Sequence, residues 1–96
     1  MLMVTTMEGG NIRTRDELHD ALIRALNLPT WYGRNLDALY DCLTALKQDT
    51  ELRLLHPARL EEALGGYARS LLSVLRDAAA DNPHFRVTLE SRSDRV

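Results

Sequence analysis

The residues best suited to chemistry lie between positions 35 and 47, where acids and leucines recur at helical spacing around one tyrosine. Asn35 is a good helix N-cap, which predicts a helix from about Leu36 to about Lys47. At roughly 100° per residue, leucines fall on one side of this helix, at Leu36, Leu39, Leu43 and Leu46. The nearly opposite side carries Asp37, Tyr40, Asp41 and Thr44. Such a helix packs by its leucines and presents two carboxylates beside a tyrosine.

Two interpretations of this polar face are open. A solvated helix face needs charges, and an acid near a helix N-terminus stabilises the helix dipole, which accounts for Asp37 without any function. However, Asp37 and Asp41 are like charges four residues apart, which is mildly destabilising, and an exposed Tyr40 between them adds apolar area to a wet surface. Residues 35–51 hold four acids and one base, a local charge of −3. Acids beside an aromatic ring suit a cationic partner, so the face is a candidate binding surface.

The composition indicates one globular domain and excludes several classes of protein. The chain has 96 residues, of which 45% are hydrophobic and 27% charged, as is typical of a small domain. A single cysteine excludes an internal disulfide and the common structural zinc sites. The net charge of −2 disfavours a general nucleic-acid binder. No apolar run is long enough to span a membrane. From the character of residues 1–7 we expect no signal peptide, and we expect a cytoplasmic protein without a cofactor.

The elements that must position the acidic helix alternate along the chain. Short apolar or alternating runs predict strands at residues 2–7, 51–55 and 84–90. Apolar periodicity and capping signals predict helices at about residues 15–26, 36–47, 57–64 and 67–80. Because helices separate the strands, we expect a parallel sheet. The predicted fold class is α/β, a three-stranded parallel sheet packed with about four helices, in one domain over residues 1–90 with a flexible charged tail at residues 91–96.

A long motif in the middle of the chain resembles the barstar family of intracellular ribonuclease inhibitors. Residues 28–44 read Leu-Pro, any residue, an aromatic, Tyr-Gly, any residue, Asn-Leu-Asp-Ala-Leu, an aromatic and Asp-Cys-Leu-Thr. Residues 12–19 are similar to the entry into the family's first helix, and residues 74–78 to its last helix. The resemblance covers nearly the whole chain and implies a three-stranded parallel sheet with helices. It also implies inhibition by an acidic helix and the preceding loop, which plug the active site of a ribonuclease.

The resemblance assigns partner-binding roles by matching position. The residues concerned are Trp31, Gly33, Asn35, Asp37, Tyr40, Asp41, Thr44 and Asp77. Asp41 matches the central acidic anchor, set against the basic groups that would hold RNA phosphate, and Trp31 matches an aromatic residue that covers the cleft. Two positions depart from the family pattern. Arg34 replaces an acid in the loop, and Ala45-Leu46 replaces a glycine followed by an exposed tryptophan.

The expected partner is therefore a cationic microbial ribonuclease, barnase-like or guanyl-specific, bound by a monomer in a 1:1 complex as an antidote or immunity protein. Direct contact with nucleic acid or a membrane is not expected. The alternative is a module of the same fold whose acidic face docks on another basic protein, such as a toxin of a different kind or a regulatory partner. An enzyme is not expected, because Asp37 and Asp41 have the type for acid–base work but no nucleophile or cleft accompanies them.

The remaining reactive side chains are expected to be structural. Cys42 lies toward the apolar side of the acidic helix and is predicted to be a buried, inert thiol. The three histidines, His19, His56 and His84, lie far apart in the sequence and follow no metal-ligand spacing.

Overall fold

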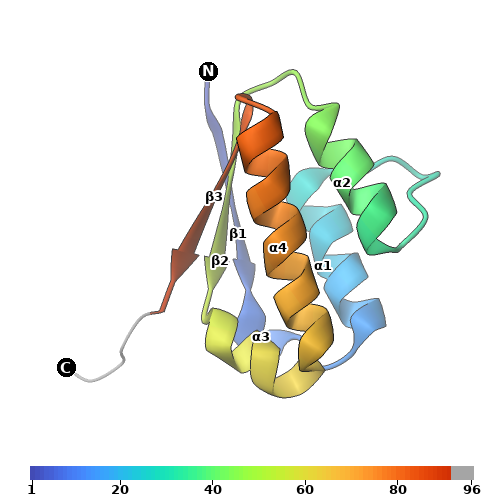
Figure 1. Cartoon of the computed structure of the whole chain (residues 1–96), viewed down its shortest axis with the longest axis vertical. Coiled ribbons are helices and arrows are strands. Elements are labelled where there is room, and N and C mark those ends of the chain that lie inside the picture. The colour runs from blue at the N-terminus through green and yellow to red at the C-terminus, as the bar shows by residue number, and fades with distance from the viewer. Residues whose placement is uncertain (92–96) are drawn as a thin grey trace.

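A sheet of three parallel strands is packed with four α-helices in the computed structural model, which describes residues 1–91 (Figure 1). The elements in chain order are β1 (Met3–Glu8), a single 3-10 turn η1 (Gly9–Asn11), α1 (Arg15–Leu26), α2 (Leu36–Thr44), β2 (Thr50–Leu55), α3 (Pro57–Leu64), α4 (Gly66–Asp81) and β3 (Phe85–Glu90). This architecture confirms the predicted α/β fold class. The predicted tail lies, apart from Ser91, outside the described residues.

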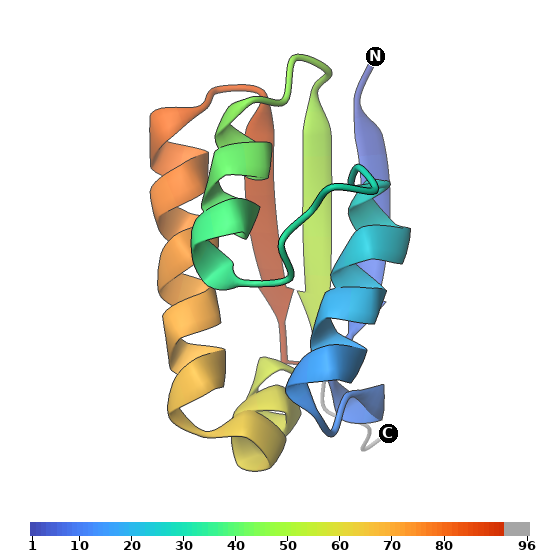
Figure 2. The same ribbon diagram turned by 90° about the vertical axis from the view of Figure 1, so that its right-hand side faces the viewer.

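The sheet has the strand order β1-β2-β3, and both pairings are parallel. Helices α1, α2 and α4 lie on one face of the sheet, whereas α3 lies at the end where β1 and β2 terminate (Figure 2). Alternate strand residues face these helices, and Met7, Leu52, Leu54 and Phe85 are buried there with exposures of 3% or less. The opposite face is polar. On that face the Thr88 hydroxyl donates a 2.7 Å hydrogen bond to the Glu51 carboxylate.

The ends of α1 form as the sequence predicts. Thr14 is the N-cap, and its hydroxyl accepts a hydrogen bond from the backbone N–H of Glu17 at 3.1 Å. The Glu17 carboxylate turns back to accept the N–H of Arg13 at 2.7 Å, a variant of the reciprocal capping box. Asn27 closes the helix in the left-handed region with φ of 52°. No helix within residues 1–91 is long and apolar enough to cross a bilayer.

The acidic helix α2 ends at Thr44, three residues before the predicted end at Lys47. The reason lies in Asn82, which is 5% exposed and comes from the turn after α4. Its side-chain amide donates hydrogen bonds to the carbonyl oxygens of Leu43 at 2.8 Å and Leu46 at 3.0 Å. These two carbonyls are thereby satisfied without a further helical turn.

Candidate functional site

The site is built on the exposed seam between α2 and α4, which pack side by side (Figure 1). Two aspartates on each helix lie four residues apart, a spacing that places both on one helix face. These are Asp37 and Asp41 on α2, and Asp77 and Asp81 on α4, and all four are exposed. We call these four residues the acidic face. The charges of Asp41, Asp77 and Asp81 all act on the Tyr40 hydroxyl, so the fold brings together acids from two stretches that lie 40 residues apart in the sequence.

Tyr40 lies within the acidic face and links its two helices. Its hydroxyl donates a hydrogen bond to the carboxylate of Asp81. The hydrogen bond to Asp81 raises the pKa of Tyr40, and burial and the charges of Asp77 and Asp41 raise it further. The ring packs against the core and is partly buried, so the expectation of an exposed Tyr40 is wrong. Its packing against neighbouring side chains removes part of the apolar area that seemed to need a partner.

Asp81 is a member of the site that the sequence interpretation missed. A signal was available, because Asp81 follows Asp77 by four residues just as Asp41 follows Asp37. What the sequence did not provide was the packing of α4 against α2, which brings the second pair beside the first.

The loop before α2 adds an aromatic flank to the acidic face. Trp31 is 76% exposed, whereas the adjacent Tyr32 is 6% exposed and belongs to the core. A largely apolar pocket of about 210 Å³ opens beside Trp31, and Leu28, Ala45 and Leu46 contribute to its lining. The two residues that depart from the family pattern after Thr44 therefore line this pocket next to the exposed indole.

Gly33 and Asn35 shape the turn from the loop into α2. Asn35 is the predicted N-cap, and its side-chain oxygen accepts the N–H of Ala38 at 2.7 Å. Its amide nitrogen donates to the Gly33 carbonyl at 3.2 Å. A Cβ atom at Gly33 would stand 3.1 Å from that amide nitrogen, so the absence of a side chain permits the close approach.

Arg34 pairs with acids of α1. Its guanidinium lies 3.1 Å from the carboxylate of Asp20 and 3.6 Å from that of Asp16, and it donates to the Asp16 carbonyl at 3.0 Å. The backbone of Arg34 has a φ of 57°, a conformation that costs free energy in a non-glycine residue. The contacts with α1 offset that cost and pair the charge of Arg34 with Asp16 and Asp20.

Thr44 and Cys42, the two remaining residues of α2 with a predicted role, lie toward its C-terminal end. The Thr44 hydroxyl donates to the carbonyl of Tyr40 at 2.9 Å, within the same helix. Cys42 is 9% exposed, and burial raises the pKa of its thiol, which agrees with an inert side chain. Within residues 1–91, no three His, Cys, Asp or Glu side chains are grouped closely enough to hold a metal ion.

Comparison with known proteins assigns the chain to a class of protein inhibitors. Residues 2–90 match the family described as Barstar (barnase inhibitor), and the chain belongs to the barstar family. Over 86 residues it is 35% identical to "Putative ribonuclease inhibitor YrdF" of Bacillus subtilis (strain 168), an alignment that covers 88% of this chain and 94% of that protein. The family is one of inhibitors and not of catalysts.

Proposed function

We propose that this protein inhibits a microbial extracellular ribonuclease, barnase-like or guanyl-specific, by binding across its cationic active site in a 1:1 complex. The single observation that carries the proposal is that exposed Asp41 of α2 and exposed Asp77 and Asp81 of α4 act together on the Tyr40 hydroxyl at the seam between these helices. Membership of the barstar family and the name of the Bacillus subtilis relative support the same class of partner. We further propose that it acts in the cytoplasm, as an antidote in the producing cell.

The electrostatics of the acidic face suit such a target. A ribonuclease stabilises negative charge on phosphate in its transition state and therefore gathers cationic groups in its cleft. Carboxylates fixed on two packed helices can occupy the positions of the phosphates, and they offer no bond that the enzyme can cleave. In this proposal Asp41 is the central anchor, and Asp37 and Asp77 contact the cleft from either side.

The neighbouring residues would complete the contact surface. Trp31 would cover the rim of the cleft, because its exposed indole offers a large apolar area at a small entropic cost. Gly33 and Asn35 would present backbone groups of the loop, while Tyr40 and Thr44 would extend the surface along α2. Asp81, joined to Tyr40, would keep that ring in place under the partner.

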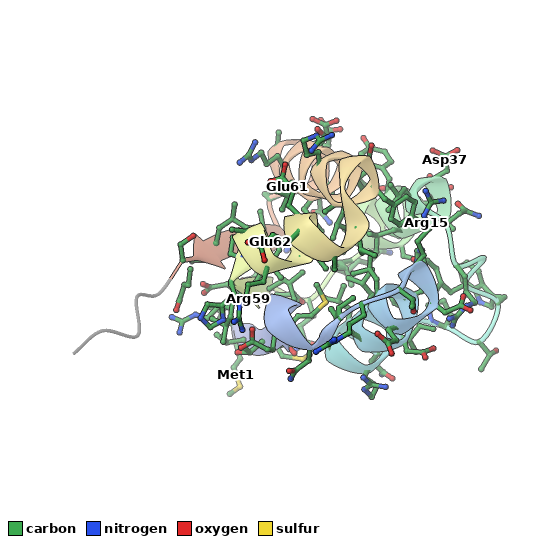
Figure 3. The ribbon with its side chains drawn as sticks, turned by 90° about the horizontal axis from the view of Figure 1, so that it is seen from below. Met1, Arg15, Asp37, Arg59, Glu61 and Glu62 are labelled. Carbon is green, nitrogen blue, oxygen red and sulfur yellow. The ribbon has the colours of Figure 1, made fainter. Side chains whose placement is uncertain are left out.

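The first experiment is titration calorimetry together with an RNA-cleavage assay against a panel of small microbial ribonucleases. Asp41→Ala is expected to weaken binding to the matched ribonuclease by about 2 kcal/mol or more, the effect of removing a central anchor. Glu62→Ala is the matched control. It removes the same charge from an exposed position on α3, away from Asp37 in Figure 3, and it is expected to bind like the wild type.

Equal affinities of Asp41→Ala and the wild type would contradict the proposed plug. If no ribonuclease in the panel is bound, a pull-down with a basic toxin or another basic protein would test whether the acidic face docks on a partner of that kind.

A further inference from the structure

His19 lies at the centre of a chain of hydrogen bonds that connects three parts of the molecule. Its ring comes from α1 and is 2% exposed. Nδ1 lies 2.7 Å from the hydroxyl of Tyr32 in the loop, and Nε2 lies 2.7 Å from the hydroxyl of Tyr67 on α4. The Tyr32 hydroxyl in turn donates to the carbonyl of Asn35 at 3.4 Å. Besides the contacts of Arg34 with α1, the loop that carries Trp31 is therefore linked to α1 and α4 through this imidazole.

When the imidazole is neutral, these hydrogen bonds can all donate in one direction, from Tyr67 through His19 and Tyr32 to the carbonyl of Asn35. Because the Tyr32 hydroxyl donates to Asn35, its oxygen accepts from Nδ1–H of His19. A neutral ring with its proton on Nδ1 has an acceptor at Nε2, and the Tyr67 hydroxyl donates to it. Every donor in the chain then has an acceptor, which is what a buried polar chain requires.

A second proton on the ring is poorly accommodated. Nε2 would become a donor, so the hydroxyl of Tyr67 would have to turn around. Charged groups surround the ring and its pocket from three elements, with Arg15, Asp16 and Asp20 on α1, Arg34 in the loop and Asp37 on α2. Burial lowers the pKa of His19, and the Arg34 guanidinium lowers it further, while Asp16 and Asp20 act in the opposite direction.

Water nevertheless has a path to the ring. A pocket of about 640 Å³ opens between α1, the loop and α4, and His19 and Tyr67 both line it. Arg15 and Asp37, which also line this pocket, lie near each other in Figure 3. The Arg15 guanidinium lies 4.1 Å from the centre of the Tyr67 ring. A protonated imidazole that turned toward this pocket would gain hydration and leave the Tyr32 hydroxyl.

We propose that His19 is a positioning residue for the loop Thr30–Asn35, and that proton uptake by its imidazole loosens this loop. Proton uptake would place a buried cation near Arg34, which belongs to that same loop. A charged ring that turns toward the pocket to gain hydration would give up its bond to Tyr32. The loop would then lose its link through His19 to α1 and α4, while Arg34 would still hold it to Asp16 and Asp20 of α1. Only the consequence for inhibition rests on the proposed function, since the response of the loop is a property of the free protein.

The free protein can report this response directly. Trp31 is the sole tryptophan of the chain and precedes Tyr32, so its emission follows the loop. On acidification within the range where far-UV circular dichroism is constant, we expect the emission of Trp31 and the amide resonances of Gly33 and Asn35 to shift. The midpoint of that shift should coincide with the titration of the His19 ring, measured by NMR.

Three variants test the assignment. His19→Gln cannot take up the proton and should make the Trp31 signal independent of pH in that range. The matched controls, His56→Gln and His84→Gln, change the other two histidines, which pair with Glu8 and Asp49, and should leave the signal unchanged. A loop signal that persists in His19→Gln, or a His19 ring that titrates while the wild-type loop does not respond, would overturn the proposal.

Tyr32→Phe gives a second test in case His19→Gln does not fold. It removes one hydroxyl and with it the link between the ring and the loop, while His19 and Tyr67 remain. The His19 ring should still titrate, but Trp31 should no longer follow it. If Trp31 follows the ring in Tyr32→Phe as it does in the wild type, the hydrogen-bonded chain does not carry the coupling.

Inhibition of a ribonuclease, measured as a function of pH, separates this inference from the proposed function. With a ribonuclease that the wild type inhibits, wild type and His19→Gln are compared at each pH, so that titration of the ribonuclease cancels. Acidification is expected to weaken the wild type roughly threefold to tenfold more than His19→Gln, the worth of about one hydrogen bond. Equal pH profiles, with the response of the free loop intact, would show that the loop does not contribute to binding. A failure of the proposed function would instead leave the free-loop titration unchanged.

Discussion

At the scale of single residues, the site depends on Tyr40 as much as on the aspartates around it. The phenol donates to Asp81 on α4 while its own backbone belongs to α2. Three carboxylates therefore act on one hydroxyl, and each of them opposes its ionisation. The ionisation of Tyr40 is for that reason a direct measure of how closely the two helices bring their acids together.

We expect Asp81→Asn to lower the pKa of Tyr40 toward its ordinary value of 10.0, because the largest contribution to the raised pKa is removed. Phenolate absorbance during an alkaline titration measures the change, and Tyr40→Phe identifies which part of the absorbance belongs to this residue. Asp37→Asn is the matched control, since Asp37 is not among the groups that raise this pKa. An unchanged titration in Asp81→Asn would show that the hydrogen bond between Tyr40 and Asp81 does not form in solution.

At the scale of elements, the acidic helix is kept short by a residue from a distant part of the chain. Asn82 donates to two carbonyls at the end of α2, and its oxygen accepts the N–H of His84 at 2.9 Å. One buried amide thus joins the end of α2 to the turn between α4 and β3. This junction fixes where α2 ends relative to α4, and with it the alignment of the two aspartate pairs.

Asn82→Asp tests this junction. The carboxylate retains an acceptor for His84 but cannot donate to Leu43 and Leu46, so it leaves two carbonyls without their donor in a site that is 5% exposed. We expect the free energy of unfolding to fall by about 2 kcal/mol or more, measured by urea denaturation. A matched change at an exposed asparagine, Asn11→Asp, should have little effect. Comparable losses in the two variants would mean that the buried amide has no special role.

At the scale of the whole molecule, charge is distributed unevenly. The net charge is only −2, yet four aspartates share one seam and the nearby Arg34 is paired with α1. A modest net charge is therefore compatible with a strongly negative binding surface, and the attraction of a cationic partner depends on the arrangement of charges more than on their sum.

For this reason we expect the association rate with a ribonuclease to fall as salt is added, most steeply up to about 0.5 M, where screening acts over a few ångströms. Stopped-flow mixing measures the rate. In Asp41→Ala the dependence on salt should be weaker than in the wild type or in Glu62→Ala. A rate that does not change with salt would contradict electrostatic steering by the acidic face.

Buried His19 should also make the stability of the whole fold sensitive to acid. Its pKa in the folded protein lies below the ordinary value of 6.5, so the unfolded chain binds more protons as the pH falls through and below that value. Unfolding is then favoured, and the free energy of unfolding should decrease between about pH 7 and about pH 5. Urea denaturation at each pH measures the decrease.

His19→Gln should remove most of this decrease, whatever its effect on stability at neutral pH. Glu8 and Glu51 also have lowered pKa values in the folded protein. Their contribution to stability is lost only as the pH falls through and below their ordinary value of 4.5, so the two effects separate along the pH axis. An equally steep decrease in His19→Gln between about pH 7 and about pH 5 would assign the acid sensitivity to another group.

The sequence by itself determined the elements of this protein and the core of its site. Capping residues such as Thr14 and Asn35 act through the backbone of their own helix, and apolar periodicity acts within one element, so both can be read locally. Asp37 and Asp41 were identified for the same reason, since they share a helix face. The resemblance to the barstar family added Trp31 and Asp77. Membership of that family is confirmed, while the binding roles of these residues remain predictions.

Only the tertiary structure decided how these local pieces meet. The acidic face takes in Asp81 because α4 packs on α2, and Asn82 binds the carbonyls of Leu43 inside α2 and of Leu46 just beyond its end at Thr44. His19 fastens the loop because Tyr32 and Tyr67 reach it from residues 13 and 48 positions away. Contacts of this kind depend on how elements far apart in the sequence are placed against one another, and no local spacing specifies that placement.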